Sequence, residues 1–412
     1  MRKLFTGYRL SGNSHSLANR TTNLPIYQFT NLPTYQTMQL PGLIDIHVHL
    51  REPGATHKED WDTGTSAALA GGFTTVLAMP NTQPPVTDAA SLDLALNAAR
   101  RKARCDYGQY LGAGPDNVDL LPDLAPRSTG LKMYLDQTYG SLRLDDMTLW
   151  MRHFAHWPRS RPIAAHAEGR TLAAVILMAQ LYDRSVHLCH VSRREEILLI
   201  KAAKEKGIKV TCEVTPHHLF LSQTNLTPNL LTPNPLIPNL LTPNPLTPNR
   251  LTVRPHLASQ ADVDALWDNL DVIDCFATDH APHTLAEKDS DSPPPGFPGL
   301  ETALPLLLTA VHEGRLTLDD VVARMYTNPR QIFNLPAQPE TWVEVDLGAE
   351  YHIRAAESHS KCGWTPFEGR RVRGRVARVI LRGQEVFRNG RILASSGYGR
   401  LGIRDWRLET GD

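Results

Sequence analysis

Asp45-Ile46-His47-Val48-His49-Leu50-Arg51-Glu52-Pro53-Gly54 is the stretch that decides the fold, and it opens inside an apolar run at residues 43–47. Side chains two residues apart in a β-strand point to one face, so His47 and His49 present both imidazoles to the same side. They lie at the carboxyl end of the predicted strand, which is where α/β barrel enzymes build their sites. Paired histidines suit a metal site but do not complete one, so the stretch predicts further ligands elsewhere in the chain.

The chain around this stretch alternates short β-rich runs with helical stretches. Apolar runs of strand length occur at residues 43–47, 73–79, 107–111, 131–134, 163–166, 186–190, 210–213 and 272–277. Ala- and Leu-rich segments of helical length lie at residues 58–70, 88–103, 170–182 and 193–206. Eight β-α units in succession indicate a parallel sheet, either closed as a (β/α)8 TIM barrel or open and doubly wound. No GxGxxG or GxxxxGK[ST] motif follows a strand, so dinucleotide-binding and P-loop sites are excluded.

Two further segments flank the predicted α/β region at residues 41–338. Residues 1–40 contain no acidic residue and carry a Pro-punctuated repeat, in which 22–28 is echoed by 30–36, so we expect a disordered lead-in rather than a targeting helix. Residues 339–412 show strand patterns and an Asn389-Gly390 turn, which predicts a small β-rich C-terminal subdomain. The strand patterns lie at residues 342–346, 372–382 and 384–387.

A tandem repeat interrupts the α/β region at residues 226–250. It consists of five units of the form Leu-Thr-Pro-Asn-x, with Ile237 once in place of Thr. Proline at every fifth position excludes a helix and removes ladder hydrogen bonds, so we expect an extended or disordered surface loop. Such an insertion is tolerated because the entropic cost of closing a loop grows slowly with its length.

Composition narrows the class of partner. Lys+Arg and Asp+Glu both number 43 in 412 residues, and this balance removes the electrostatic argument for nucleic acid or an anionic membrane surface. No run approaches 18 consecutive apolar residues, so no membrane span is expected. The five cysteines are scattered without a CxxC pair, which indicates a reducing, cytoplasmic environment. We therefore expect a small-molecule substrate.

Further candidate ligands end or follow the later predicted strands. They are Lys132 in 131–134, His166 at the end of 163–166, His190 at the end of 186–190 and Asp279 after 272–277. A lone histidine is more often a core or surface residue than a ligand. Packing does not explain four histidines and an aspartate at one end of successive strands, and a buried lysine is costly unless neutralised or paired.

These stretches resemble the dihydroorotases of the cyclic amidohydrolase superfamily, and within them the dihydroorotase domains of animal multifunctional pyrimidine-synthesis proteins. The resemblance spans residues 41–398 apart from the repeat. Besides residues 40–54, the matching motifs are Ala78-Met79-Pro80-Asn81-Thr82, Gly130-Leu131-Lys132-Met133-Tyr134-Leu135, residues 213–220, Thr278-Asp279-His280-Ala281-Pro282-His283, residues 293–302 and Gly363-Trp364-Thr365-Pro366-Phe367-Glu368-Gly369. The resemblance implies a (β/α)8 barrel around a binuclear zinc centre.

The resemblance also implies a role for each candidate ligand. His47, His49 and Asp279 would bind one Zn²⁺, His166 and His190 the other, and Lys132 would bridge both as a carbamate formed with CO2. Members close to the animal enzyme can carry a third zinc. The matching positions are Cys189 and Glu213, although Cys189 suits a small buried hydrophobe equally well.

The reaction implied by the resemblance is the reversible cyclisation of N-carbamoyl-L-aspartate to (S)-dihydroorotate in pyrimidine (UMP) biosynthesis. Asp279 would accept a proton from the attacking hydroxide and deliver it to the leaving ring nitrogen. The substrate carboxylate would be held by Arg51, Asn81 and His283, and the ring by Arg254, Pro295 and Gly296. Thr138 and Tyr139 fall in a loop that closes over substrate, where phenylalanine is common at the second position.

Two other functions stay open. A dihydropyrimidinase- or allantoinase-like cyclic amidase shares the paired histidines but binds substrates without this carboxylate, so it does not require Arg51. A scaffold descended from the same fold would have lost metal ligands, against which the complete ligand set argues. The repeat precedes Arg254, and a reoriented loop would displace this residue.

The resemblance carries expectations about partners as well. A homodimer is expected, and carbamoyl-phosphate synthetase and aspartate carbamoyltransferase modules accompany this domain in the multifunctional proteins. Residues before 41 do not resemble the family, so incomplete strand pairing is expected in the C-terminal subdomain.

Overall fold

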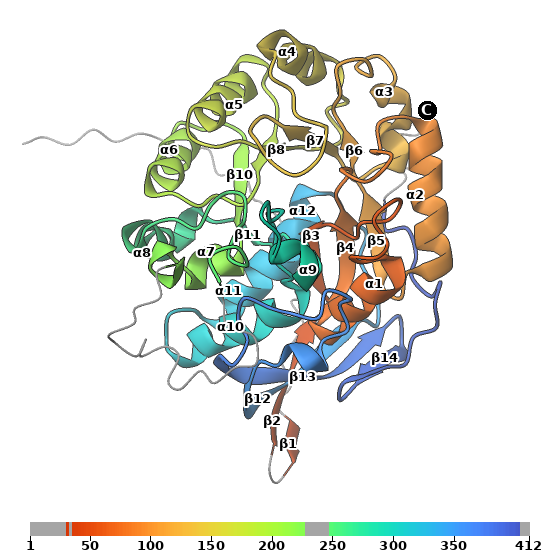
Figure 1. Ribbon diagram of the computed structural model, residues 1–412, viewed down its shortest axis with the longest axis vertical. Coiled ribbons are helices and arrows are strands. Elements are labelled where there is room, and N and C mark those ends of the chain that lie inside the picture. The colour runs from red at the N-terminus through yellow and green to blue at the C-terminus, as the bar shows by residue number, and fades with distance from the viewer. Residues whose placement is uncertain (1–29, 33–34, 227–246, 404–412) are drawn as a thin grey trace, which may run out of the picture.

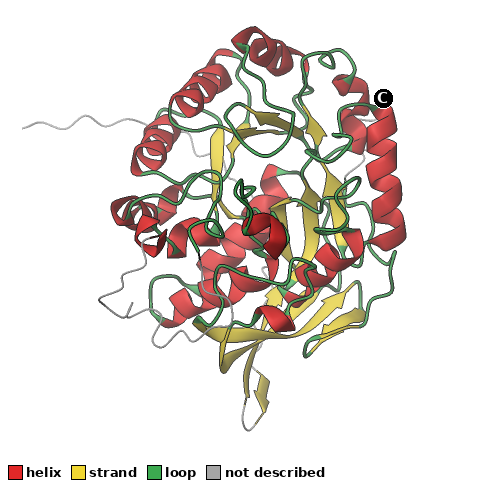
Figure 2. Cartoon of the chain, in the orientation of Figure 1, coloured by secondary structure: helices red, strands yellow, loops and turns green. Residues whose placement is uncertain are grey.

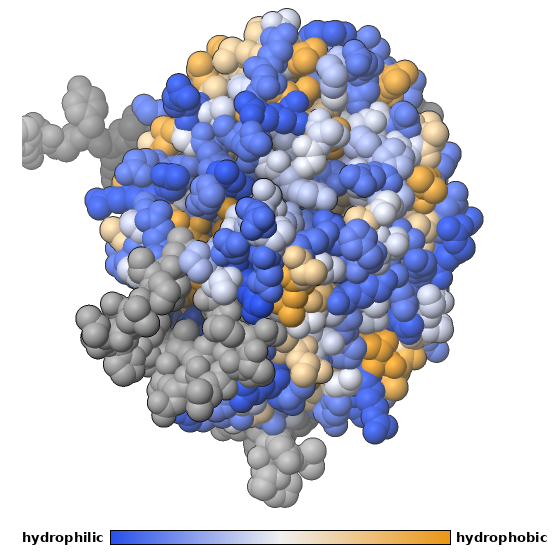
Figure 3. All heavy atoms as spheres, viewed as in Figure 1, coloured by the Kyte–Doolittle hydropathy of each residue, from blue (hydrophilic) through white to orange (hydrophobic). Residues whose placement is uncertain are grey.

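The protein was analysed as a computed structural model that describes residues 30–32, 35–226 and 247–403 (Figure 1). Most of the predicted lead-in and residues 227–246 of the proline repeat lie outside the described residues. Among the described helices, none is both long and apolar enough to cross a bilayer. The face in Figure 3 is mostly polar, with small, separate apolar patches.

Parallel strands form the centre of the molecule. They are β3 (Leu43–Val48), β4 (Phe73–Ala78), β5 (Asp106–Gln109), β6 (Leu111–Gly112), β7 (Leu131–Tyr134), β8 (Ile163–His166), β9 (Val186–Leu188), β10 (Val210–Val214) and β11 (Cys275–Phe276). Their ladders run β3-β4-β5 and β6-β7-β8-β9-β10-β11. Tyr110 alone separates β5 from β6, and an isolated parallel bridge joins Val48 to His280, just after β11. Two parallel ladders thus succeed each other along the chain, and all eight predicted strand positions are confirmed.

Most of the helices lie around the outside of these strands (Figures 1 and 2). The α-helices are α1 (Trp61–Ala70), α2 (Ala89–Lys102), α3 (Leu121–Leu124), α4 (Met147–His156), α5 (Arg170–Leu181), α6 (Arg194–Glu205), α7 (Pro216–Phe220), α8 (Gln260–Asp268), α9 (Leu285–Lys288), α10 (Leu300–His312), α11 (Leu318–Val322) and α12 (Asn328–Ile332). The four predicted helices correspond to α1, α2, α5 and α6. The first of them begins at Trp61 rather than at residue 58, because Asp60 caps it by accepting a hydrogen bond from Thr63 N at 2.9 Å.

A six-stranded antiparallel sheet lies beside the parallel strands, at the bottom of Figure 1. Its order is β1-β2-β12-β13-β14-β15, with β1 (Thr30–Leu32), β2 (Tyr35–Pro41), β12 (Trp342–His352), β13 (Arg371–Leu381), β14 (Gln384–Arg388) and β15 (Arg391–Ile392). The three tail strands and the turn at Asn389-Gly390 are therefore where the sequence predicts them. An α/β architecture with a separate β-rich sheet is confirmed.

The start of the chain corrects two expectations. Residues 35–40 are not an unstructured lead-in, because β2 pairs antiparallel with β12 from Pro41 opposite Trp342 to Thr37 opposite Asp346. The tail sheet is therefore not left with incomplete pairing at this edge. Met38 and Leu40 alternate with polar residues and are 4% and 1% exposed, so the sequence did carry a strand signal.

The β-rich tail also returns to the parallel strands. Tyr107 N, in β5, donates to Arg400 O at 3.0 Å, and Gly402 N donates to Tyr107 O at 2.8 Å. Arg382 and Gln338 both bond the buried Asp106 carboxylate at the start of β5. These contacts tie the two sheets together, so the division into domains at residues 338 and 339 stays a prediction.

Candidate metal centre

Three predicted ligands meet where β3 and β11 end. Nε2 of His49 lies 3.1 Å from Oδ1 of Asp279, and Nε2 of His47 lies 3.3 Å from the same oxygen. The ligand atoms of the three residues all lie within 4.8 Å of one another. Since all three are buried, this group has the donor types and the spacing that a divalent metal ion requires.

His47 also belongs to a second group, with Cys189 and Glu213. Its Nδ1 is hydrogen-bonded to Oε1 of Glu213, whose other oxygen lies 3.1 Å from Nε2 of His187. The ligand atoms of His47, Cys189 and Glu213 lie within 4.8 Å of one another. Both ring nitrogens of His47 therefore face acidic groups, and the positions that the sequence suggested for a third zinc are brought together.

Lys132, His166 and His190, the other predicted ligands, lie beside these two groups. Nδ1 of His166 lies 2.8 Å from Nε2 of His190, and Nζ of the fully buried Lys132 lies 2.8 Å from Sγ of Cys189. Among the described residues, His190 Nδ1 and His166 Nε2 have no hydrogen-bond partner, although the latter lies 3.4 Å from a Glu168 oxygen. Buried ring nitrogens without partners are costly, so these histidines fit metal ligation better than packing.

Burial keeps three of the four candidate histidines neutral, whereas His47 differs. Burial lowers the pKa of His49 to about 4, and it holds the pKa of His166 below and that of His190 well below the ordinary range. Neutral imidazole is the form that binds a metal ion. For His47, burial and Lys132 lower the pKa, but Glu213 and Asp279 outweigh them and the pKa rises to about 10.

The backbone around the centre is strained at three site residues. Arg51, His190 and Asp279 have φ angles of 60°, 37° and 46°, in the left-handed region that non-glycine residues rarely adopt. Strain of this kind costs about 1–3 kcal/mol per residue and gathers at functional sites. It therefore supports a functional role for this edge of the parallel strands.

Two of the three predicted carboxylate-binding residues line a cavity of about 280 Å³, which His283 does not line. Arg51, Asn81 and Tyr139 line it. Arg51 is 5% exposed, and its Nη2 lies 3.0 Å from Nε2 of His283. Asn81 joins the cavity to the metal ligands, since its Oδ1 lies 2.7 Å from Nδ1 of His49 while its Nδ2 donates to Tyr139 O at 3.0 Å.

The predicted ring-binding residues lie on two neighbouring loops. Arg254 is half-buried and lies close to Glu168. Burial raises the pKa of that carboxyl, but His166 and then Arg254 outweigh it and hold the pKa below its usual range. Pro295 O lies 3.1 Å from Nε2 of His283, and Gly296 has a φ of 144°. A Cβ on Gly296 would collide with the Ala281 carbonyl, so only glycine fits there. Thr138 is half-buried in the loop that carries Tyr139.

Sequence analysis missed Lys58 as a site residue. Lys58 is 4% exposed, its Nζ lies 3.1 Å from Nδ1 of His283, and it donates to the Tyr139 hydroxyl at 3.2 Å. A Glu287 oxygen lies 2.9 Å away and balances its charge. The hydroxyl of Tyr139, to which the sequence assigned no role, thus binds Lys58. In the sequence, Lys58 is marked only by its position two residues before Asp60, the residue that caps α1.

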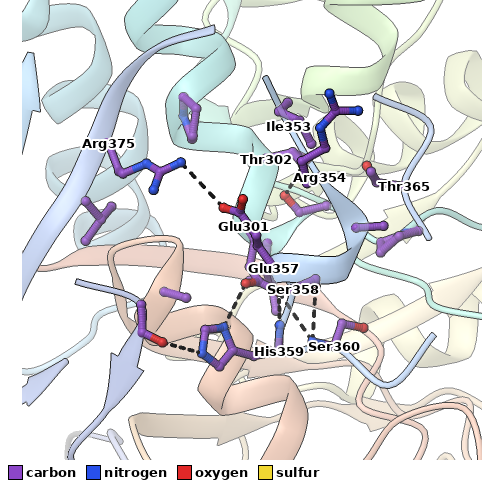
Figure 4. A pocket seen from close by; sticks show the side chains of 18 of the residues that line it. Glu301, Thr302, Ile353, Arg354, Glu357, Ser358, His359, Ser360, Thr365 and Arg375 are labelled. Carbon is purple, nitrogen blue, oxygen red and sulfur yellow. Dashed lines mark hydrogen bonds and ion pairs between the residues drawn. The ribbon is translucent and has the colours of Figure 1, made fainter. Parts of the chain in front are cut away.

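A second cavity, of about 130 Å³, lies between the start of α10 and the tail loop 353–360 (Figure 4). Glu301 holds this loop through the hydroxyl of Ser358 and through His359, whose Nδ1 lies 3.0 Å from Oε2 of Glu301. The wall reaches His280, but no metal or substrate residue predicted from the sequence lines this cavity. It is therefore separate from the candidate centre.

Comparisons with known proteins agree with this geometry. The sequence pattern of the family described as Dihydro-orotase-like matches residues 37–113. The chain is 55% identical over 369 residues to the multifunctional protein CAD of Squalus acanthias, covering 90% of this chain but only 16% of that protein. It is 36% identical over 371 residues to the dihydroorotase of Pyrococcus furiosus, covering 86% of this chain and 82% of the relative.

A solved structure shows the same fold. The inactive dihydroorotase-like domain of the Chaetomium thermophilum CAD-like multifunctional protein superposes with a TM-score of 0.74 at 30% identity, over 89% of this chain and 99% of that domain. Together with the extensive coverage of the archaeal relative, this likeness assigns the family. The chain belongs to the dihydroorotase family.

Proposed function

We propose that this chain is an active dihydroorotase that interconverts N-carbamoyl-L-aspartate and (S)-dihydroorotate in UMP biosynthesis. The observation that supports it is the link between a buried His47–His49–Asp279 group and the cavity that the buried Arg51 lines, made by Asn81, whose Oδ1 lies 2.7 Å from Nδ1 of His49. A metal group alone fits any cyclic amide hydrolase, whereas a buried arginine beside it requires an anion on the substrate. We infer that the parallel strands close as a (β/α)8 barrel around this site.

The donor set fits two zinc ions. His47, His49 and Asp279 would hold one, His166 and His190 the other, with Lys132 as the bridging carbamate and Cys189 and Glu213 beside a third ion. Carbamylation would turn a buried cation into an anionic oxygen ligand, which removes the cost of burying Lys132. When bound, the zinc ions make hydroxide available near neutral pH and polarise the amide carbonyl.

The side chains of the site would transfer the proton and bind the substrate. Asp279 accepts the proton of the attacking hydroxide and passes it to the leaving ring nitrogen. Burial raises its pKa, but His47 and His49 outweigh burial and hold the pKa well below the usual range, so the side chain is an ionised carboxylate near neutral pH. Arg51, Asn81 and His283 hold the substrate carboxylate, while Arg254, Pro295 and Gly296 contact the ring and Thr138 and Tyr139 cover it.

Metal removal tests this proposal. We expect zinc-loaded protein to hydrolyse L-dihydroorotate, and we expect a chelator to abolish the rate, because the site supplies no other source of hydroxide near neutral pH. Re-addition of Zn²⁺ in the presence of bicarbonate should restore activity, since both the metal and the Lys132 carbamate must re-form. A rate that is insensitive to chelator, or zinc-loaded protein without turnover, would contradict the proposal.

The second candidate is a cyclic amidase for uncharged rings, such as a dihydropyrimidinase or an allantoinase. Such a substrate would leave the buried Arg51 guanidinium without an anion, so we expect dihydrouracil and allantoin to be turned over far more slowly than L-dihydroorotate. A scaffold without catalysis is disfavoured by the presence of all six predicted ligands in one place. Preference for uncharged rings in a substrate profile would favour the second candidate.

We propose a homodimer that uses the exposed face of α5. Leu177 and Leu181 lie one helical turn apart on this helix and are 57% and 70% exposed. We expect Leu181→Glu to shift the protein from dimer to monomer in sedimentation or light scattering, because a second copy would have to bury the new carboxylate. Leu393→Glu, at a residue 50% exposed on the tail sheet, is the control and should leave the mass unchanged. A wild-type monomer would refute the proposed dimer.

We also propose which enzymes act beside this chain and in which compartment it lies. Because it spans 16% of the length of the shark protein, carbamoyl-phosphate synthetase and aspartate carbamoyltransferase modules would act beside it, within one polypeptide or as partners. All five cysteines are buried and unpaired, which suits the cytoplasm.

A further inference from the structure

One lysine outside the metal centre is buried completely. Lys288 ends α9 and is 0% exposed, and its Nζ donates to the carbonyl of Thr252 at 2.7 Å and to that of Pro294 at 3.0 Å. The rings of Phe297 and Trp364 each lie 5.6 Å from the same nitrogen. The ammonium is therefore held by two main-chain oxygens and two aromatic faces.

Such a site is energetically expensive for a core position. Burial alone lowers the pKa of Lys288 to about 7, so the folded protein accepts a substantial desolvation cost to keep this side chain inside. An apolar residue of similar length would fill the same space without that cost. The presence of an ammonium donor at this position therefore indicates a role other than packing.

Its two acceptors lie beside substrate-binding residues. Thr252 stands two positions before Arg254, and Pro294 immediately precedes Pro295 and Gly296. Gly296 N also donates to the same Thr252 carbonyl at 3.1 Å, and Arg250 pairs with Asp289 further along the two loops. The Lys288 ammonium thus bonds both loops at the residues next to the substrate-binding positions.

We propose that Lys288 is a positioning residue for substrate, and that it holds Arg254 and the Pro295-Gly296 loop at the spacing that the dihydroorotate ring requires. This inference rests on the proposed dihydroorotase function.

Further contacts fix the loop between the proline repeat and Arg254. The structure describes residues 247–250 at the end of the repeat, where Arg250 forms a two-pronged ion pair with Asp289 at 2.6 Å, and Asn249 Nδ2 donates to Ser290 O at 3.1 Å. Leu251 and Val253 are then buried, at 3% and 1% exposure. The loop is therefore fixed on both sides of Thr252 before it reaches Arg254, so changes in the repeat should not reach the substrate.

The test replaces Lys288 with methionine, which keeps the length and removes the donor. We expect KM for L-dihydroorotate to rise about tenfold while kcat and zinc content stay within about twofold, because the metal centre does not depend on this loop spacing. Lys204→Met is the matched control. Its Nζ also donates to a main-chain carbonyl, that of Val272 at 2.7 Å, but at the opposite end of the strands, so KM should not change.

A double-mutant cycle separates positioning from a general loss of structure. If Lys288 acts through Arg254, Lys288→Met should raise KM little further in an Arg254→Ala background, whereas it should raise KM by its full factor in an Arg51→Ala background. Equal factors in both backgrounds, or a fall in zinc content that accounts for the effect, would overturn the proposal.

Two further measurements distinguish failure of the Lys288 proposal from failure of the proposed function or of folding. Wild-type turnover of L-dihydroorotate is measured first, so failure of the proposed function is seen separately from an unchanged KM in Lys288→Met. If Lys288→Met does not fold, Asp289→Ala opens the exposed Arg250–Asp289 pair instead. A KM increase of about two- to threefold that vanishes with Arg254→Ala supports the positioning of Arg254 by contacts between the two loops, and an unchanged KM refutes it.

Discussion

Asp279→Asn should reduce kcat for L-dihydroorotate hydrolysis by at least about a thousandfold. The amide keeps the shape of the side chain but cannot accept a proton, and Oδ1 of Asp279 lies within 3.3 Å of a ring nitrogen of both His47 and His49. The substitution therefore removes the proton carrier and weakens one metal position at once. Steady-state rates and zinc content per chain should be measured on the same preparation.

Asp274→Asn is the control for this change. Asp274 lies just before β11, as Asp279 lies after it, and its carboxylate accepts from Cys212 N at 2.7 Å and from Lys204 at 2.5 Å. Its loss should lower stability but leave kcat nearly unchanged, because it lies at the opposite end of the strand. If Asp279→Asn retained turnover within about tenfold of wild type, the proton-transfer role would be lost.

The second large effect is expected for Arg51→Ala, which should raise KM for L-dihydroorotate by about 30- to 150-fold with a smaller change in kcat. A charge-assisted hydrogen bond to a buried anion contributes about 2–3 kcal/mol, and this sets the range. Nη2 of Arg51 lies 3.0 Å from Nε2 of His283, and its Nε donates to Pro282 O at 3.1 Å, so the guanidinium is held in place before substrate arrives. Initial rates over a wide range of substrate concentration give both constants.

A buried arginine elsewhere supplies the comparison. Arg324 is 8% exposed and donates to Ile273 O at 3.0 Å and to Leu270 O at 2.6 Å, at the other end of the parallel strands. Arg324→Ala should destabilise the protein without raising KM. Equal KM changes in the two variants would mean that Arg51 supports the fold rather than the substrate, and the choice of dihydroorotate over uncharged rings would lose its main argument.

Local sequence determined the parallel strands and the candidate ligands. Alternation at His47 and His49 and short apolar runs ending in His166 or His190 are patterns of neighbouring residues, and they survive folding because the carboxyl ends of parallel strands meet at one edge. The same reasoning located β12, β13 and β14. It did not find β2, whose alternation at Met38 and Leu40 is only a few residues long and follows a proline-punctuated stretch.

Tertiary structure alone decided which side chains support the site. Lys58 reaches His283 across 225 positions, and Lys288 ties Thr252 to Pro294, contacts that no local periodicity encodes. A lysine looks the same in the sequence whether it is solvated or buried, because its role depends on which distant carbonyls and rings surround it. The sequence thus determined the reactive groups of this protein, while packing between distant segments decided how substrate-binding loops are held around them.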